Sequence, residues 1–558
     1  MRLVALILLL VVGCTPAPRE SAGQQRAATS SSGAVAAMPQ KPIVIANAYE
    51  PATLETSFGQ GSGNLEFGIM LSGYLAYIDS PYKPMPYLAQ ELPTLEAGTW
   101  KVLPDGRMET LYKLRPNLRF HDGTPITAED FAFGHEVRTN PLVPAPTAEV
   151  EPYVSAVRVI DPSTMVIEWK QTYIMASQII GPSFSPMPRH LLADLYHSDM
   201  NAFVNGPQWR ENYVGSGPYR LERWEPGVMM VLRAFDGFVF GKPAIDQITM
   251  RFIGDANVVV ANLMSGDVDM AYSATISYPQ GETLQQTGWA GNVEYSPGLP
   301  RYAHFQMRDW GNTQTAVQDP RVRRAMFHAV ERQTIVETIY AGHARVLHVW
   351  LYPADPSYEA VDRAVTKYQF DMSRAQALLQ EAGWRRAGDG PLQNASGETL
   401  NMYLLAHAGR VEEQETEVIA SAWRSLGMPM ETTWLTAAQM SDGEYRSKFG
   451  AVAYDRRPMD SMVWTSDNVS GPENRWRLGN RNGYTNPRLD ELWQRVMTTV
   501  AFREREPLLI DAMKVMAEDA VVVPTHLQPR VMAYPTGITG VKHPQTGVYI
   551  MSPWEWRW

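Results

Sequence analysis

Stretches in which apolar and polar residues alternate occur in the first half of the chain, and each predicts a strand. Val157–Trp169 alternates on both sides of Asp161-Pro162-Ser163, which predicts a hairpin closed by a tight turn. Tyr219–Leu232 repeats this arrangement around Glu225-Pro226-Gly227, and Ile245–Phe252 alternates without a turn. The first half therefore predicts antiparallel strands joined by short turns.

Helical spacing of apolar residues dominates the second half. Asp319 precedes Pro320, an arrangement typical of a helix start, and predicts one helix over Val322–Ile339. The same spacing predicts further helices over Asp371–Ala382, Val411–Leu426, Asn486–Thr499 and Arg503–Asp519. Strands are expected between or beyond them at Thr399–Leu405, Met430–Leu435 and Val521–Val523. This alternation of strand and helix indicates an α/β fold.

The N-terminus has the pattern of an export signal. Arg2 precedes the apolar run Leu3–Val12, which is too short to span a bilayer, and small residues lead to Cys14. The segment resembles the lipobox of bacterial lipoproteins, which implies a signal peptide at 1–13 and lipidation of Cys14. Two alternatives stay open: a plain signal peptide with an incidental cysteine, and a short uncleaved membrane helix.

Residues 15–40 are rich in Ala, Ser, Gln and Gly, and they hold too few apolar groups to order themselves. Together with Cys14 they predict a lipidated flexible tether over 14–40. Order is expected to begin near Lys41, because Pro42–Ala46 reads as a buried strand.

Composition narrows the class of protein. Cys14 is the only cysteine among 558 residues, so no internal disulfide and no multi-cysteine metal site are expected. A hydrophobic content of 45% over this length predicts at least two lobes. The net charge of −10 lacks the basic footprint of a nucleic-acid-binding protein.

One motif combines a strand, a turn and a helix start. Leu114–Asp130 reads as a strand, a tight turn at Asp122-Gly123 and a helix capped by Thr127. Further segments follow along the chain, namely Gly215–Tyr219, Gly241–Asp246, Ser265–Asp269, Asp319–Ala325, Asp371–Trp384, Gly483–Pro487 and Ala517–Pro524. In this order the segments resemble the extracytoplasmic solute-binding proteins of ABC importers, family 5 (cluster C), which carry oligopeptides, dipeptides, nickel and related ligands.

The resemblance implies a two-lobed periplasmic-binding-protein clamp of type II, with an additional subdomain in the first lobe. The first lobe would comprise residues 41–71, 191–297 and 521–558, the subdomain 72–190, and the second lobe 298–520. Ligand would be held between the lobes and passed unaltered to a permease.

The resemblance also implies candidate ligand-binding residues. Peptide-binding relatives use a "DYxDP" segment to bind the ligand's α-amine, and Asp455 stands at about that place, but Arg456 and Arg457 replace the expected neighbours. Two interpretations stay open for Asp455: binding of an amine, or pairing with a neighbouring arginine. Arg456 or Arg457 would suit a ligand carboxylate, or lie on the solvated surface.

Other candidates come from the expected cleft and from aromatic residues. Each has a structural alternative, either a turn or core packing. The candidates are Tyr49, Glu50, Gly217, Tyr219, Trp434, Trp464 and Trp476, with His348 and Trp350 as further residues that would line a pocket.

No motif of a common enzyme class is present: the chain lacks H-E-x-x-H, G-x-S-x-G and the P-loop pattern. We therefore expect no catalysis, no cofactor and no metal. The function expected is a lipid-anchored, monomeric receptor in the periplasm or on the outer face of the cytoplasmic membrane, with an oligopeptide-like ligand and permease subunits as partners. The alternatives are the same fold binding a cello-oligosaccharide, a secreted hydrolase, and a surface adhesin or chaperone without a small ligand.

Overall fold

The computed structural model describes residues 41–58, 64–80, 83–143, 150–177, 179, 184–271, 275–386, 388–459, 461–542 and 552–558. The expected signal peptide, the expected tether and Cys14 lie outside these residues. None of the described helices combines the length and the apolar character that a membrane crossing requires.

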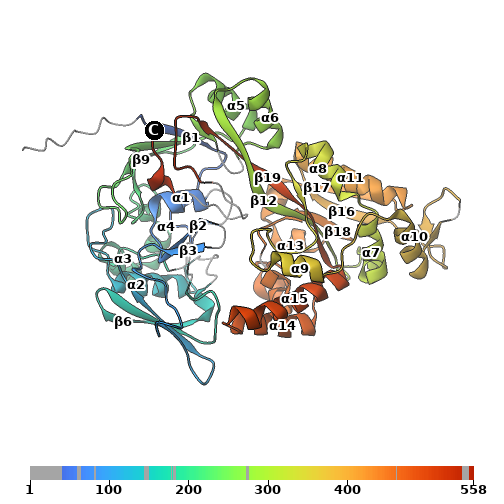
Figure 1. Cartoon of the computed structure of the whole chain (residues 1–558), viewed down its shortest axis with the longest axis horizontal. Coiled ribbons are helices and arrows are strands. Elements are labelled where there is room, and N and C mark those ends of the chain that lie inside the picture. The colour runs from blue at the N-terminus through green and yellow to red at the C-terminus, as the bar shows by residue number, and fades with distance from the viewer. Residues whose placement is uncertain are drawn as a thin grey trace, which may run out of the picture. The chain divides into compact units, whose positions relative to one another are not determined.

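A mixed sheet of eleven strands organises the described residues (Figure 1). Its strands are β1 (Ile43–Asn47), β8 (Tyr219–Glu225), β9 (Met229–Ala234), β10 (Gln247–Phe252), β11 (Met270–Ala271), β12 (Gly291–Phe305), β13 (Arg345–Val346), β16 (Met402–His407), β17 (Met430–Leu435), β18 (Val452–Arg456) and β19 (Val522–Pro535). They are ordered β17-β16-β18-β12-β19-β11-β1-β10-β9-β8, and β13 pairs with β19 outside this path.

The long strands β12 and β19 occupy the middle of this order and pair antiparallel from Gly291 opposite Pro535 to His304 opposite Val522. Only the start of β19 was expected from the sequence. Prolines interrupt both strands, and a proline within a sequence argues against a central strand because it lacks an N–H donor. The structure accommodates them with register shifts at Pro297/Pro300 and at Arg301/Tyr302.

Three smaller sheets accompany the large one. They comprise β4 (Trp100–Val102), β5 (Met108–Lys113), β7 (Thr164–Trp169) and β6 (Val154–Asp161); β2 (Ala76–Ser80) and β3 (Lys83–Pro86); and β14 (Arg385–Arg386) and β15 (Leu392–Gln393). The predicted hairpin at Val157–Trp169 is confirmed by β6 and β7, which pair antiparallel on either side of the turn. The predicted hairpin at Tyr219–Leu232 is likewise confirmed by β8 and β9.

The helices carry the caps that the sequence predicted. Thr127 forms a capping box with Asp130, and the Asp319 carboxylate accepts a hydrogen bond from Arg321 N. The helices are α1 (Asn64–Leu71), α2 (Ala128–Thr139), α3 (Arg189–Ser198), α4 (Met200–Asn205), α5 (Ala256–Ser265), α6 (Tyr278–Gln286), α7 (Pro320–His328), α8 (Arg332–Tyr340), α9 (Tyr358–Ala364), α10 (Met372–Glu381), α11 (Arg410–Ser425), α12 (Ala437–Ser441), α13 (Gly443–Ser447), α14 (Pro487–Thr498) and α15 (Phe502–Asp519).

The prediction of one helix over Val322–Ile339 was wrong, because the chain breaks between α7 and α8. At the break Val330 enters the hydrophobic core. The buried Arg332 guanidinium at the start of α8 donates to the carbonyls of Leu347 and Tyr368. Tertiary contacts thus override the continuous helical spacing.

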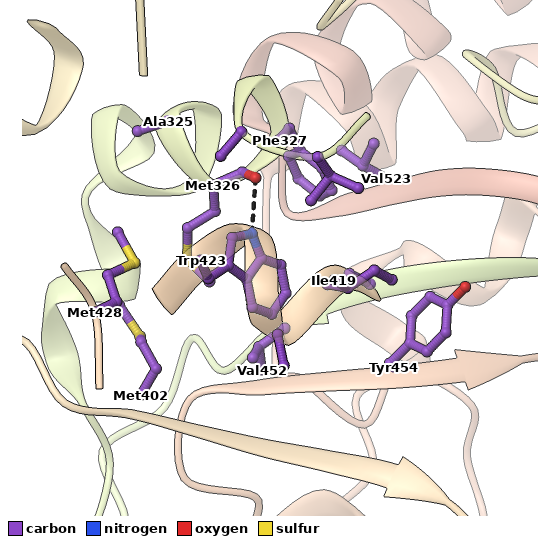
Figure 2. Packing of buried hydrophobic residues seen from close by; sticks show 14 of the residues in the cluster. Ala325, Met326, Phe327, Met402, Ile419, Trp423, Met428, Val452, Tyr454 and Val523 are labelled. Atoms are coloured by element: carbon purple, nitrogen blue, oxygen red, sulfur yellow. Dashed lines mark hydrogen bonds between the residues drawn. The ribbon is translucent and has the colours of Figure 1, made fainter. Parts of the chain in front are cut away.

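Trp423 on α11 anchors the core on one face of β16 and β18 (Figure 2). Its side chain is fully buried, and its indole N–H donates to Met326 O on α7 at 2.8 Å. Met402 on β16 and Val452 on β18 belong to the same cluster, so α11 fixes this face of the strands. The opposite face of the same strands carries the polar residues described next.

Candidate ligand site

Asp455 lies near the end of β18 with its carboxylate almost fully buried. One carboxylate oxygen, Oδ1, accepts from Arg456 N at 2.7 Å and lies 2.6 Å from His407 Nε2. The other, Oδ2, accepts from Arg446 Nη2 at 2.7 Å, and Arg481 Nη1 lies 3.8 Å away. A carboxylate only accepts, so His407 carries its proton on Nε2.

The charge state of Asp455 follows from these partners. Burial alone would raise the pKa of its carboxyl, but Arg446, His407 and Arg481 together hold that pKa well below its ordinary range. Asp455 is therefore ionised and already paired within the protein. Of the two interpretations left open by the sequence, internal pairing describes this structure, although the partners are Arg446 and Arg481 rather than Arg456 or Arg457.

Arg456 and Arg457 have different surroundings. Arg456 Nη1 donates to Glu412 on α11 at 2.9 Å. Arg457 Nη1 donates to Gly479 O at 3.1 Å, and the guanidinium lies 5.7 Å from the centre of the Trp464 ring. No acidic side chain among the described residues pairs with Arg457.

Tyr302 and His304 on β12 lie on the same face as Asp455, which is opposite Tyr302 in the strand register. Burial lowers the pKa of His304 to about 3, and Arg481, Arg446 and Arg457 contribute in the same direction. The ring is therefore neutral. Tyr302 packs against Trp350 and Trp464, with ring centres 4.8 and 5.8 Å apart.

Three of the four remaining candidates from the first half of the chain occupy structural positions. Glu50 accepts hydrogen bonds from Trp224 Nε1 at 2.7 Å and from Gly227 N at 2.9 Å, so it holds the β8–β9 hairpin. Tyr219 is fully buried in the core around β8. Gly217 lies against the backbone of Leu71, where a Cβ would approach to 2.5 Å. Tyr49 is half-exposed.

The candidate tryptophans divide into buried and accessible residues. Trp350 and Trp464 belong to a buried cluster. Trp434 lies on the edge strand β17 and is 37% exposed. Trp476 is half-buried, packs near Trp310, and has a left-handed backbone with φ of 60°. Core packing is thus observed for Trp350 and Trp464 only.

His348 is a structural residue here. Its Nδ1 lies 3.2 Å from Arg332 Nη2, and burial lowers the pKa of the imidazole to about 4. A neutral ring that accepts from Arg332 accounts for both observations. Among the described residues no group of His, Cys, Asp and Glu side chains is arranged to hold a metal ion.

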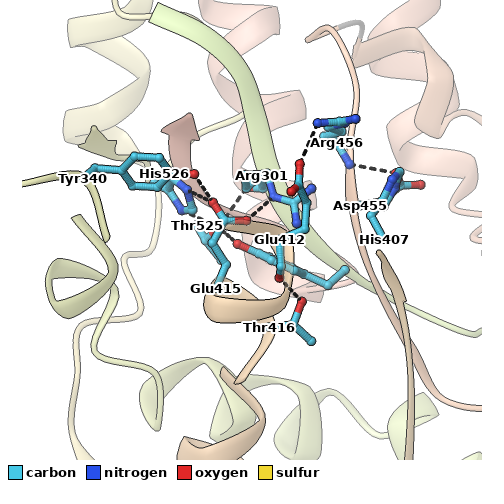
Figure 3. A network of polar contacts seen from close by, with 11 residues as sticks. Arg301, Tyr340, His407, Glu412, Glu415, Thr416, Asp455, Arg456, Thr525 and His526 are labelled. Atoms are coloured by element: carbon cyan, nitrogen blue, oxygen red, sulfur yellow. Dashed lines mark hydrogen bonds and ion pairs between the residues drawn. The ribbon is translucent and has the colours of Figure 1, made fainter. Parts of the chain in front are cut away.

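Sequence reasoning missed a buried network on the other face of β12 (Figure 3). Glu415 of α11 pairs with Arg301 Nε at 2.7 Å and lies 2.9 Å from His526 Nε2, and Tyr340 Oη donates to it at 2.5 Å. Burial would raise the pKa of Glu415, but Arg301 and His526 lower it to about 2. These residues come from four distant segments, β12, α8, α11 and β19, so no local pattern reveals them.

The comparisons with known proteins agree with this architecture. A family model for bacterial extracellular solute-binding proteins, family 5 (middle), matches residues 84–474, which is more than half of the chain. The chain belongs to this family. The recognition made from the motifs is therefore confirmed. The family consists of solute-binding proteins and not enzymes, so the expectation that the chain is not an enzyme is confirmed by its membership.

Individual relatives are distant in sequence but similar in fold. The oligopeptide-binding protein AppA of Bacillus subtilis is 23% identical over 445 residues, 77% of this chain and 76% of AppA. The structure of an oligopeptide-binding protein from Thermus thermophilus, complexed with a pentapeptide, gives a TM-score of 0.75 at 23% identity and covers 93% of this chain and 96% of that one. NikZ from Campylobacter jejuni, in complex with Ni(L-His), gives 0.76 at 20% identity and covers 93% and 100%. The predicted α/β two-lobed clamp is confirmed.

Proposed function

We propose that this family 5 protein is the receptor of an ABC importer and captures an oligopeptide-like ligand. The family match over residues 84–474, with a fold shared by peptide-binding proteins along 93% of the chain, carries the proposal. Closure of the lobes on the ligand would present the surface that a permease recognises. For that, the closed form must bind the ligand more tightly than the open form.

The accessible candidates remain Tyr49, Trp434 and Trp476. Tyr49 and Trp434 are exposed and Trp476 is half-buried, so these residues are partly accessible to a ligand. Tyr219 and Trp464 are buried in the core. Peptide main chains would be bound through protein amides, carbonyls and bridging water, which tolerates varied side chains. No catalytic role is proposed for any residue, because the receptor releases its ligand chemically unchanged.

The ligand class is tested by releasing co-purified small molecules with denaturant and identifying them by mass spectrometry. Calorimetric titration of the emptied protein with peptides and with cello-oligosaccharides then separates the two ligands. We expect heat from peptides. Binding of cello-oligosaccharides without binding of peptides would replace this proposal by the oligosaccharide receptor, and turnover of either ligand would indicate a hydrolase.

We also propose that Cys14 is lipidated and anchors a monomer outside the cytoplasmic membrane. The apolar segment before Cys14 supports this. Cys14→Ala is expected to move the protein from the membrane fraction to the soluble fraction and to remove the acyl mass from the mature N-terminus, whereas Thr15→Ala changes neither. An unlipidated wild-type protein would contradict the anchor, and light scattering of the detergent-purified protein tests the monomer.

A further inference from the structure

The arginines around Asp455 carry more charge than the site neutralises. The positive charges of Arg446, Arg457 and Arg481 all lower the pKa of His304. Among the described residues, Asp455 is the carboxylate that pairs with Arg446 and Arg481. Arg456 is accounted for separately by Glu412. Counted over the described residues, the cluster therefore has an excess of positive charge at a place that is mostly shielded from solvent.

Several donors in this cluster lack an acceptor. Within the described residues the Nε atoms of Arg457 and Arg481 and the indole N–H of Trp464 are buried donors without a hydrogen-bond partner. The neutral His304 ring adds one more unpaired N–H, and its second nitrogen is an unpaired acceptor. A buried donor left unpaired costs about 1–3 kcal/mol, so such groups are rare and call for an explanation. Unpaired donors together with excess positive charge match a ligand group that is anionic and only accepts.

The arginines are held in place before any ligand binds. Gly479 lies against Arg457, where a Cβ would approach Nη1 to 2.8 Å. The buried Asn480 donates to Tyr484 O at 2.8 Å and accepts from Gly483 N at 3.1 Å, which fixes the loop that carries Arg481. Because these side chains are already ordered, binding a ligand costs less conformational entropy than it would in a flexible site.

A ligand amine fits this place poorly. Both oxygens of Asp455 already accept from protein donors, and an incoming ammonium would meet three guanidinium groups. Like charges at this range repel strongly where water is excluded. The residue that stands where relatives bind the amine is thus a counter-ion that positions Arg446 and Arg481.

We propose that Arg457 and Arg481, supported by Arg446 and Asp455, form an oxyanion subsite of the second lobe that selects ligands carrying a carboxylate or phosphoryl group. Arg457 and Arg481 contact the oxyanion, and Asp455 is a positioning residue. The inference rests on the proposed receptor function, because it names the chemistry of the same ligand. The site lies within residues 302–481.

The test uses full-length protein and matched synthetic peptides in free, N-acetylated and C-amidated forms, with affinity measured by calorimetry. Each charge-assisted hydrogen bond lost costs about 10-fold or more in affinity. We expect acetylation to change Kd less than about threefold and amidation to raise it at least about tenfold. Arg457→Gln should remove the penalty for amidation, whereas Arg424→Gln, an equal change of charge on the exposed face of α11, should keep it.

Competition with glutarate and inorganic phosphate distinguishes the source of the oxyanion. Competition by phosphate without an amidation penalty would indicate a phosphoryl group and would support the subsite. A larger penalty for acetylation than for amidation would overturn it, as would indifference to both modifications and to both anions. Arg481→Gln repeats the test if Arg457→Gln fails to fold.

Failure of the receptor function is separable from failure of the subsite. If no peptide binds, the peptide receptor is wrong, and the subsite is judged by whether glutarate or phosphate raises the Tm of the wild type and of Arg424→Gln but not of Arg457→Gln. Equal shifts, or none, in all three proteins would overturn the subsite.

Discussion

Two groups of buried charges lie on opposite faces of β12, beginning at the adjacent residues Arg301 and Tyr302. On one face Arg301, Glu415 and His526 are fully buried, and both oxygens of Glu415 have partners within the network. On the other face, three guanidinium groups lie around Asp455, and among the described residues Asp455 is the one carboxylate that pairs with any of them. Arg301 Nη1 and Nη2 are also buried without a hydrogen-bond partner, so unpaired donors occur on both faces. The two clusters differ instead in charge, which is balanced between Arg301 and Glu415 and unbalanced around Asp455 among the described residues.

The difference shows how to separate structural from functional burial of charge. A buried ion pair whose two charges neutralise each other requires no ligand. Removing one partner lowers the free energy of unfolding, because the other charge stays buried. A buried cluster with unmatched charge is maintained at a cost in stability, which is characteristic of binding sites. Four predictions test this distinction, beginning with the largest effect.

Glu415→Gln should destabilise the protein by about 3–5 kcal/mol, because it leaves the Arg301 guanidinium buried without its counter-ion. Thermal and urea unfolding measure the effect. Glu417→Gln is the matched control: Glu417 lies on the exposed face of the same helix and pairs with Arg424, so its loss should cost less than about 1 kcal/mol. Equal effects at the two positions would contradict the structural role of the network.

The effect of Glu415→Gln should depend on pH. The pKa of Glu415 is lowered from 4.5 to about 2, so the ionised carboxylate stabilises the folded state above pH 4.5 and that contribution is lost as pH falls towards 2. The difference in Tm between wild type and Glu415→Gln should be largest near pH 6. It should shrink as the pH falls from 4.5 to 2. A difference that does not vary with pH would show that charge is not its cause.

Asp455→Asn should destabilise the protein by about 2 kcal/mol, less than Glu415→Gln, because Arg446 and Arg481 keep some exposure to water. The preference for peptides with a free carboxylate should persist in this variant. Calorimetry with the free and C-amidated peptides measures this preference, and the N-acetylated peptide reports on the amine. Selective loss of the peptides with a free amine would instead indicate an amine site at Asp455.

Arg456→Gln should have the smallest effect, below about 1 kcal/mol in stability and below about threefold in Kd, since its guanidinium forms a part-exposed pair with Glu412. Comparison with Arg457→Gln therefore separates two adjacent arginines of equal charge. A larger loss of affinity at Arg456 than at Arg457 would reverse the assignment.

Much of the fold followed from local patterns, because turns and caps are properties of neighbouring residues. The turn at Asp161-Pro162-Ser163 and the caps at Thr127 and Asp319 were predicted where the structure has them. The extent of β12 and β19 was not predictable in this way. Their prolines contradict a central strand locally, and only pairing with distant residues overrides that preference.

The candidate site was predictable only in part, for the same reason. Asp455 was found because its segment resembles a motif, but its partners come from β16, α13 and the loop around Arg481. Nothing in the residues near His407, Arg446 or Arg481 indicates that they converge. The balance of charge, on which ligand selection depends, is a property of the folded chain alone.

The position of β19 also bears on biogenesis. This strand lies between β12 and β11 in the sheet, yet among the strands that the structure describes it is the last to be synthesised. Neither β12 nor β11 can pair with β19 until translation is nearly finished. Pairing between strands that are far apart in the sequence is slow. A polypeptide built this way stays incompletely folded while it emerges from the ribosome, which is the condition that passage through a secretion pore requires.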